Sequence, residues 1–237
     1  MFANYHTHTA RCHHATGEDK AYVEAAIQNG FQVLGFSDHC PWIFSDGYVS
    51  PIRMTPDELD GYMTSLTALK KEYAADITIY IGLESEYVPE MLPEQQKFLQ
   101  DYLIDYQILG EHFLYPEQRG IYTGKPTDNA AELKHYVDQV IAGMETGNYL
   151  YLAHPDLFHF IGDPALYEQE FRRLCVYLKE KQIPIEINQL GLADHRQYPN
   201  PAFLKIAESV GNTAIIGCDA HHPSALLDTD SQQACKK

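Results

Sequence analysis

The stretch ITIYIGLESEY, residues 77–87, carries the clearest structural signal in this chain. Residues 77–83 form an apolar run that is rich in β-branched side chains, which predicts a buried strand. Two carboxylates, Glu84 and Glu86, follow where that strand ends. A strand that is apolar on both faces is typical of a parallel sheet covered by helices. The stretch therefore predicts an α/β protein with acidic side chains at one edge of its sheet.

The same alternation extends outward in both directions. Helices are predicted over residues 16–30, 55–73, 128–146 and 200–211, from near Pro93, and from Asp163-Pro164 to about residue 181, several of them with N-cap and first-turn proline signals. Strands are predicted over residues 1–5, 31–37, 77–83, 105–110, 148–154, 184–188 and 212–218. No Pro/Gly/Ser-rich linker divides the chain. We predict a single distorted (β/α)7 TIM-like barrel over residues 1–237, with a shortened helical cover after the last strand.

Composition restricts the class of protein. Hydrophobic residues make up 45% of the 237, charged residues 21%, and the formal net charge is −16. This acidity argues against nucleic acid as the main partner, because binding to a phosphate backbone needs a dense basic surface. No signal peptide or membrane-spanning run is recognised, and the 5 cysteines form no CxxC pair. We expect a cytoplasmic protein with reduced thiols, either a monomer or a homodimer.

Metal-binding residue types follow the predicted strands. They occur as His6 and His8, Asp38 and His39, Glu84 and Glu86, His112, His154, Glu186 and Asn188, and Asp219 and His221. In a (β/α) barrel the C-terminal strand ends open at one mouth, so these side chains are expected to converge there. Imidazole and carboxylate ligands without thiolates suit Zn²⁺, Fe²⁺ or Mn²⁺. The number of candidate ligands exceeds what one ion can use, which favours two or three divalent ions.

The motifs YHTHT, FSDHC, GLESE, GEHF, AHPDL, IEIN and GCDAH occur in this order. Together they resemble the PHP (polymerase and histidinol phosphatase) superfamily, and most closely its histidinol-phosphate phosphatase branch. The resemblance implies a trinuclear site in which three sets of ligands share one carboxylate. These sets are His6, His8, Glu84 and Asp219; Glu84, His112 and His154; and His14, His39 and His221. Family spacing selects His14, but the adjacent His13 stays open as the alternative.

The resemblance implies hydrolysis of L-histidinol phosphate to L-histidinol and inorganic phosphate, a step of histidine biosynthesis, by attack of a metal-bound hydroxide. Glu84, Asp219 and His221 are the residues assigned to this catalysis, and Asp38 is a candidate orienting carboxylate. A phosphate monoester also needs a cationic clamp. Arg196 is the first candidate for it and Arg119 the second. Glu86, Glu111 and Asp156 are candidates for contacting the substrate's ammonium and imidazole groups.

Other functions remain open at this stage. A phosphoesterase of the same superfamily could act on nucleotides, oligonucleotides or other small phosphate esters, and the 17 tyrosines could stack on bases. An amidohydrolase shares the HxH start and the late aspartate, but usually has a lysine where Glu84 stands. A metal-binding module without activity would lack some of the nine ligands, and none is missing here.

Overall fold

The computed structural model describes residues 1–236, which form two compact units. Unit 1 comprises Met1–Ser85, Pro89–Gln107 and the chain from Gly217 onward. Unit 2 comprises Glu86–Val88 and Ile108–Ile216. Unit 1 is thus built from the beginning and the end of the described chain, and most of unit 2 is one long internal segment.

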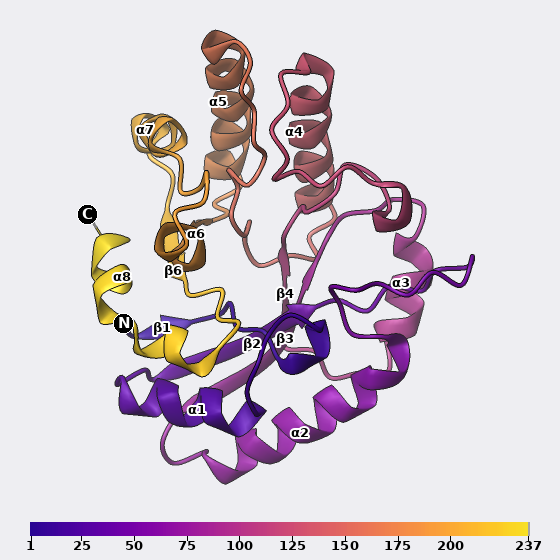
Figure 1. Ribbon diagram of the computed structural model, residues 1–237, viewed down its shortest axis with the longest axis vertical. Coiled ribbons are helices and arrows are strands. Elements are labelled where there is room, and N and C mark those ends of the chain that lie inside the picture. The colour runs from indigo at the N-terminus through magenta and orange to yellow at the C-terminus, as the bar shows by residue number, and fades with distance from the viewer. Residues whose placement is uncertain (237) are drawn as a thin grey trace. The chain divides into compact units, whose positions relative to one another are not determined.

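A curled sheet of four strands in the order β1-β2-β3-β4 organises unit 1 (Figure 1). The strands are β1 (Ala3–Asn4), β2 (Val33–His39), β3 (Thr78–Ser85) and β4 (Tyr106–Leu109), which continues into unit 2. β1 pairs with β2, and β2 with β3, in parallel. The register of the second pair sets His39 beside Glu84. Pairing of the backbone alone therefore brings two predicted ligands together.

Helices cover one face of this sheet, and α1 and α2 lie along it (Figure 1). The capping box predicted at Thr55 is confirmed, because Glu58 accepts hydrogen bonds from the backbone N of Thr55 at 2.7 Å and from its Oγ1 at 2.9 Å, but the α-helix itself begins later, at Leu59. Pro56 opens the short 3₁₀ helix Pro56–Glu58 that leads into α2. The helices of unit 1 are α1 (Asp19–Gln28), α2 (Leu59–Glu72), α3 (Leu92–Leu99) and α8 (Thr229–Ala234), with short 3₁₀ helices at Ala10–Cys12 and Pro223–Leu227.

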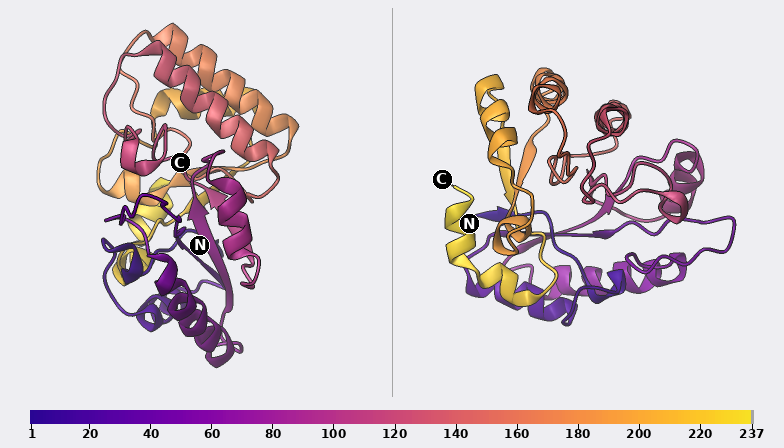
Figure 2. Two further views of the ribbon diagram at one scale, coloured as in Figure 1. Left: turned by 90° about the vertical axis from the view of Figure 1, so that its right-hand side faces the viewer. Right: turned by 45° about the horizontal axis from the view of Figure 1, so that its top comes forward.

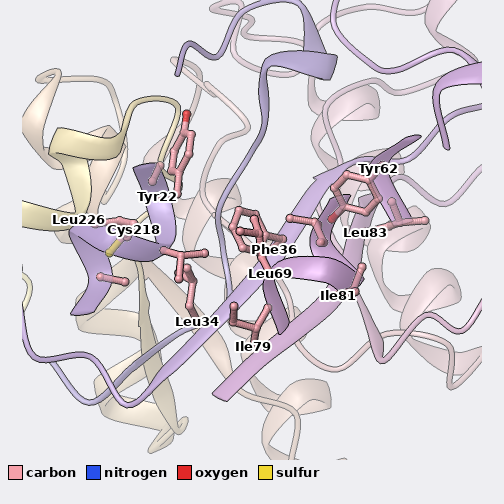
Figure 3. Close-up of a cluster of buried hydrophobic side chains, with 14 of the residues drawn as sticks. Tyr22, Leu34, Phe36, Tyr62, Leu69, Ile79, Ile81, Leu83, Cys218 and Leu226 are labelled. Atoms are coloured by element: carbon pink, nitrogen blue, oxygen red, sulfur yellow. The ribbon is translucent and has the colours of Figure 1, made fainter. Parts of the chain in front are cut away.

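The core of unit 1 lies between the sheet and these helices (Figure 3). Phe36 and Leu83 from the strands and Tyr62 of α2 belong to this cluster, and all three are buried. The Tyr62 hydroxyl donates to the carbonyl of Gly82 at 2.8 Å, so this buried polar atom has a partner. Burial of each such side chain contributes about 1.5–3 kcal/mol, which fixes the strand ends that carry the predicted ligands.

Unit 2 is a layer of helices beside a short sheet. α4, α5 and α7 lie next to one another (Figure 2). Both predicted N-caps are confirmed: Asp163 accepts from the backbone N of Ala165 at 2.9 Å, and Asn200 accepts from that of Ala202 at 2.8 Å. The elements are α4 (Ala130–Glu145), α5 (Pro164–Glu180), β5 (Ile185–Asn188), α6 (Gln189–Ala193), α7 (Pro201–Val210) and β6 (Ala214–Gly217), with a 3₁₀ helix at Glu117–Arg119.

The strand predicted over residues 148–154 is wrong in extent. This segment contributes only Leu152, which forms single parallel bridges to Leu109 of β4 and to Ile185 of β5. The extended run stops because His154 takes a positive φ of 26° directly before a proline. Residues 1–236 therefore contain six named strands, in sheets of four and two, instead of the predicted seven. The architecture is a mixed α/β fold with a curled parallel sheet.

The structure bears on two further features, membrane-spanning helices and cysteine pairing. Within residues 1–236, no helix combines the length and the apolar character needed to cross a membrane. All five cysteines are buried free thiols, as expected.

Candidate metal centre

Asn4, the last residue of β1, positions the first two histidines. Its Nδ2 donates to the carbonyl of His6 at 3.1 Å, and its Oδ1 accepts from the backbone N of Cys218 at 2.8 Å. The backbone N of His8 donates to the carbonyl of Ala220 at 3.0 Å. These bonds hold residues 6–8 against residues 218–220, so the two ends of unit 1 meet at one point.

Four predicted ligands converge there, and all four side chains are buried. Asp219 Oδ1 lies 3.1 Å from His8 Nε2 and 3.5 Å from His6 Nε2. Glu84 Oε2 lies 3.4 Å from His6 Nε2 and 3.5 Å from His8 Nε2. The Nε2 atoms of the two histidines are 3.2 Å apart. Two imidazoles and two carboxylates thus each contribute one potential ligand atom to the same small region.

Asp38 determines which nitrogen of His8 faces this volume. Its Oδ1 lies 3.3 Å from His8 Nδ1, and the same carboxylate accepts hydrogen bonds from the backbone N and the hydroxyl of Thr9. Nδ1 of His8 faces this carboxylate, which turns Nε2 toward Asp219 Oδ1. Between these two atoms there is a place for one positive charge, either the proton of a charged imidazole or a metal ion bound by both groups. The orienting role predicted for Asp38 agrees with this geometry.

A second group joins His14, His39 and His221. Nδ1 of His14 lies 2.7 Å from the carbonyl of Cys12, and Nδ1 of His221 lies 3.0 Å from the carbonyl of Asp219. Both Nδ1 atoms thus face backbone carbonyls, and the two Nε2 atoms face each other at 3.0 Å. His39 connects the two groups, since its Nδ1 lies 3.3 Å from Glu84 Oε2.

His13 and His14 occupy different surroundings. His13 is exposed, has a positive φ of 67°, and lies nearest to a carboxylate at 3.8 Å from Glu58. His14 instead points its Nε2 at His221. The structure therefore brings His14, and not His13, to the other predicted ligands of unit 1.

The electrostatics of the centre favour an added positive charge. Burial alone would lower the pKa of His8, but hydrogen bonds to Asp219 and Asp38 raise it well above its usual value. Burial alone would raise the pKa of Asp219, yet the surrounding histidines hold it well below its usual range. The pKa of His221 falls to about 3, because burial and the neighbouring His8 oppose its protonation. The donor set therefore fits divalent metal ions.

Sequence reasoning missed Cys12. This residue ends the 3₁₀ helix Ala10–Cys12, its side chain is buried, and its Sγ lies within 4.8 Å of ring nitrogens of His8 and His221. Burial alone would raise the pKa of its thiol, but hydrogen bonds with His14 and His8 lower it. The available signal was its position between His8 and His14. Its thiol differs from the imidazole and carboxylate groups that follow the strands, and it lies on a turn instead of a strand end.

The two remaining predicted ligands lie together in unit 2. The rings of His112 and His154 have centroids 4.9 Å apart. His112 Nδ1 lies 2.9 Å from Glu86 Oε1, which orients that ring. The backbone N of His154 donates to Glu186 at 3.0 Å, and Asn188 donates to the same carboxylate at 2.9 Å. Glu86 and Glu186 thus support this histidine pair.

The other acidic residues predicted to contact substrate are buried. Glu111 accepts from the backbone N of Tyr87 at 3.1 Å and from Gln139 at 2.8 Å, and burial raises its pKa well above the usual value. Asp156 accepts from the backbone N of Asn200, and burial raises its pKa to about 7. Both carboxyl groups take part in local hydrogen bonding within unit 2.

The predicted phosphate clamp also belongs to unit 2. Arg196 donates from Nη2 to Asp194 at 2.9 Å and from Nη1 to the hydroxyl of Tyr198 at 3.2 Å. Arg119 is the last residue of the 3₁₀ helix Glu117–Arg119. Their contacts with substrate, and that of Glu86, stay predictions.

Comparisons with known proteins complete the description of the site. The PHP domain family model matches residues 4–190. A protein of Deinococcus radiodurans named probable histidinol-phosphatase is 26% identical over 93% of this chain and 86% of its own length. The histidinol-phosphatase of Bacillus subtilis is 34% identical over 46% of this chain and 43% of its own length. The structure of a histidinol phosphate phosphatase from Lactococcus lactis, complexed with zinc, L-histidinol and phosphate, covers 99% of this chain and 92% of its own, with a TM-score of 0.71 and 18% identity.

Proposed function

The chain belongs to the PHP domain family, and from this premise we propose that it is a metal-dependent phosphomonoesterase that hydrolyses L-histidinol phosphate to L-histidinol and inorganic phosphate. The observation that carries the proposal is the convergence of His6, His8, Glu84 and Asp219 in a buried volume, where the two Nε2 atoms lie 3.2 Å from each other and 3.1–3.5 Å from the carboxylate oxygens. The substrate follows from the names of the relatives from Deinococcus radiodurans and Bacillus subtilis.

The proposed metal ligands are those that the sequence predicts. In unit 1 they are His6, His8, His14, His39, Glu84, Asp219 and His221, and in unit 2 they are His112 and His154. Two or three Zn²⁺, Fe²⁺ or Mn²⁺ ions bound by such residues supply a water nucleophile near neutral pH and neutralise phosphate oxygens. Zinc in the Lactococcus lactis protein supports this choice.

The chain's own residues then orient these groups. Asp38 fixes the ring of His8, the carbonyls of Cys12 and Asp219 fix those of His14 and His221, and Glu86 fixes that of His112. The carboxyl groups of Glu84 and Asp219 lie beside the imidazoles of His6 and His8. We propose that Arg196 contacts the substrate phosphate, with Arg119 as the second cationic group. Glu86, which holds His112, is retained as a third candidate for substrate contact.

The proposal also covers the fold, the location and the oligomeric state of the enzyme. We propose one (β/α)7 barrel and one domain in which the segment around Leu152 stands in the place of the seventh strand, because the observed pairings of β1 with β2 and of β2 with β3, and both bridges of Leu152, are parallel. We also propose a cytoplasmic enzyme that acts on a small phosphorylated metabolite as a monomer or a homodimer.

Phosphate release by the metal-replete protein tests the proposed substrate. L-Histidinol phosphate is compared with AMP, a short oligonucleotide and an aryl phosphate at equal concentration. We expect kcat/KM to favour histidinol phosphate by about a hundredfold or more, which equals about 2.7 kcal/mol of selective transition-state binding. Equal rates on all four substrates, or a preference for AMP or the oligonucleotide, would reject this substrate and leave the metal centre in place.

Two variants separate the proposed roles. Asp219→Asn should abolish phosphate release, whereas Asp138→Asn, which changes an exposed carboxylate that pairs with Lys134 and Arg173, should not. Arg196→Met should raise KM for phosphate esters by about tenfold while metal content stays at the wild-type level. An unchanged KM would remove Arg196 from the proposed phosphate clamp.

A further inference from the structure

Cys12 places a sulfur atom inside the group of imidazoles at the centre of unit 1. Its side chain is fully buried, and its Sγ, a ring nitrogen of His8 and a ring nitrogen of His221 all lie within 4.8 Å of one another. Atoms that bind one metal ion must approach each other to about this distance. The same spacing criterion joins His14, His39 and His221. His221 is common to both groups.

The backbone around Cys12 holds the sulfur in this position. Thr9 caps the 3₁₀ helix Ala10–Cys12 by accepting a hydrogen bond from the backbone N of Arg11. The backbone N of Cys12 donates to the carbonyl of Thr9 at 3.1 Å, and the carbonyl of Cys12 accepts from His14 Nδ1 at 2.7 Å. The turn that presents the sulfur therefore also aims the ring of His14. A metal ion held by His14 and His221 lies beside a preformed thiol donor.

We propose that Cys12 is a metal ligand, and that it supplies one thiolate to the position of His14, His39 and His221, which it approaches through His221. Metal binding breaks the S–H bond, forms a sulfur–metal bond and releases one proton to solvent. This inference rests on the proposed metal centre, and it adds a ligand of a different chemical class to the nine predicted ones.

A thiolate changes the preference of this position. His14, His39 and His221 are neutral donors as ligands, so Cys12 adds the negative charge that this group lacks. Soft thiolate ligands favour zinc, whereas Mn²⁺ prefers oxygen donors. The consequence is a position selective for zinc, next to a position with the carboxylates Glu84 and Asp219 that suits harder ions.

X-ray absorption at the zinc edge tests this proposal directly. A zinc–sulfur bond of about 2.3 Å is distinct from zinc–nitrogen bonds of about 2.0–2.1 Å. We expect one sulfur scatterer per zinc-loaded wild-type protein, lost in Cys12→Ser and retained in Cys218→Ser. Cys218 is the matched control because it is also buried, and because it directly precedes the predicted ligand Asp219.

Affinity gives a second readout that does not depend on activity. Loss of a residue that only supports a ligand costs about 10–100-fold in metal affinity, so loss of a direct ligand should cost at least about tenfold. Cys12→Ser should therefore weaken zinc binding at one position by at least about tenfold, and it should weaken Mn²⁺ binding less. Bound zinc with only nitrogen and oxygen neighbours in the wild-type protein would overturn the proposal for Cys12 and leave the metal centre intact. Failure to bind zinc at all would instead overturn the metal centre itself. The wild-type spectrum decides the question even if Cys12→Ser fails to fold.

Discussion

Replacement of Asp38 gives the strongest test of how unit 1 aims its proposed ligands. The carboxylate accepts from His8 Nδ1, from the backbone N and hydroxyl of Thr9, and from the backbone N of His39 at 2.8 Å. Asp38→Ala removes all four acceptor contacts at once. Nδ1 of His8 then loses its partner, and the ring is no longer held with Nε2 facing Asp219.

The expected magnitude follows from this geometry. Loss of an outer-shell partner costs about 10–100-fold in metal affinity, or about 1.4–2.7 kcal/mol. Asp38 contacts two predicted ligands, His8 and His39, so we expect the upper end of this range for Asp38→Ala. Asp38→Asn should cost about tenfold or less, because its amide oxygen can still accept from His8 while its NH₂ group faces the hydroxyl of Thr9. Removal of one partner of a buried charged pair should also lower the free energy of unfolding by about 3–5 kcal/mol.

Competition with a chromophoric chelator measures the affinity, and urea unfolding measures stability without metal. Asp60→Ala is the control, since Asp60 is an exposed acceptor for Tyr102 in the same unit. A folded Asp38→Ala protein that binds metal within about threefold of wild type would refute the orienting role. Weaker binding by Asp38→Asn than by Asp38→Ala would refute the assignment of the donors.

Further predictions concern stability and are measured by urea or thermal unfolding. Gly82→Ala should lower the free energy of unfolding by about 1–3 kcal/mol, because its Cβ would lie 2.6 Å from a ring carbon and 2.7 Å from the carbonyl oxygen of Tyr106. Gly61→Ala, in α2 with no atom within 4 Å of the new Cβ, should instead raise it by about 0.5–1 kcal/mol; an equal effect at both positions would contradict this reasoning. Asn4→Ala leaves the backbone N of Cys218 without its buried acceptor and should lower the free energy of unfolding by about 1–3 kcal/mol. A variant as stable as wild type would contradict this role of Asn4. Saturating zinc at about 100 times its Kd should stabilise the wild-type protein by about 2.7 kcal/mol, and a chelator should remove this gain; a melting temperature indifferent to both would argue against a buried metal centre.

The sequence predicted local structure well where a short-range signal was present. The capping box at Thr55, the caps at Asp163 and Asn200, and the apolar run of β3 all correspond to observed elements. Residues 148–154 have the same apolar composition, but pairing there is confined to Leu152. Sequence patterns report which side chains can be buried. They do not report where a backbone turn, such as the one at His154, ends the ladder.

The candidate site shows a similar division. Ligand types at strand ends predicted the residues that converge in unit 1, because parallel pairing forces such ends to one edge. Cys12 escaped this reasoning because its position depends on the 3₁₀ turn after β1, and the role of Asn4 depends on a contact with residue 218 that no local pattern encodes. Position in the sequence alone does not distinguish His14 from His13, because the two differ in where their side chains point. The backbone at His13, with φ of 67°, turns that neighbour to the surface.

The discontinuous build of unit 1 has a consequence for synthesis on the ribosome. His6 and His8 emerge early, but Asp219 and His221 emerge only after the long internal segment Ile108–Ile216 of unit 2 has been translated. At about 5–20 residues per second this interval is on the order of ten seconds. During it, residues 4–8 lack the segment 218–220 to which they are hydrogen-bonded, and the early histidines cannot form the complete centre. Metal loading at this centre is therefore a late event of translation, and a ribosome stalled within unit 2 would release a chain unable to complete it.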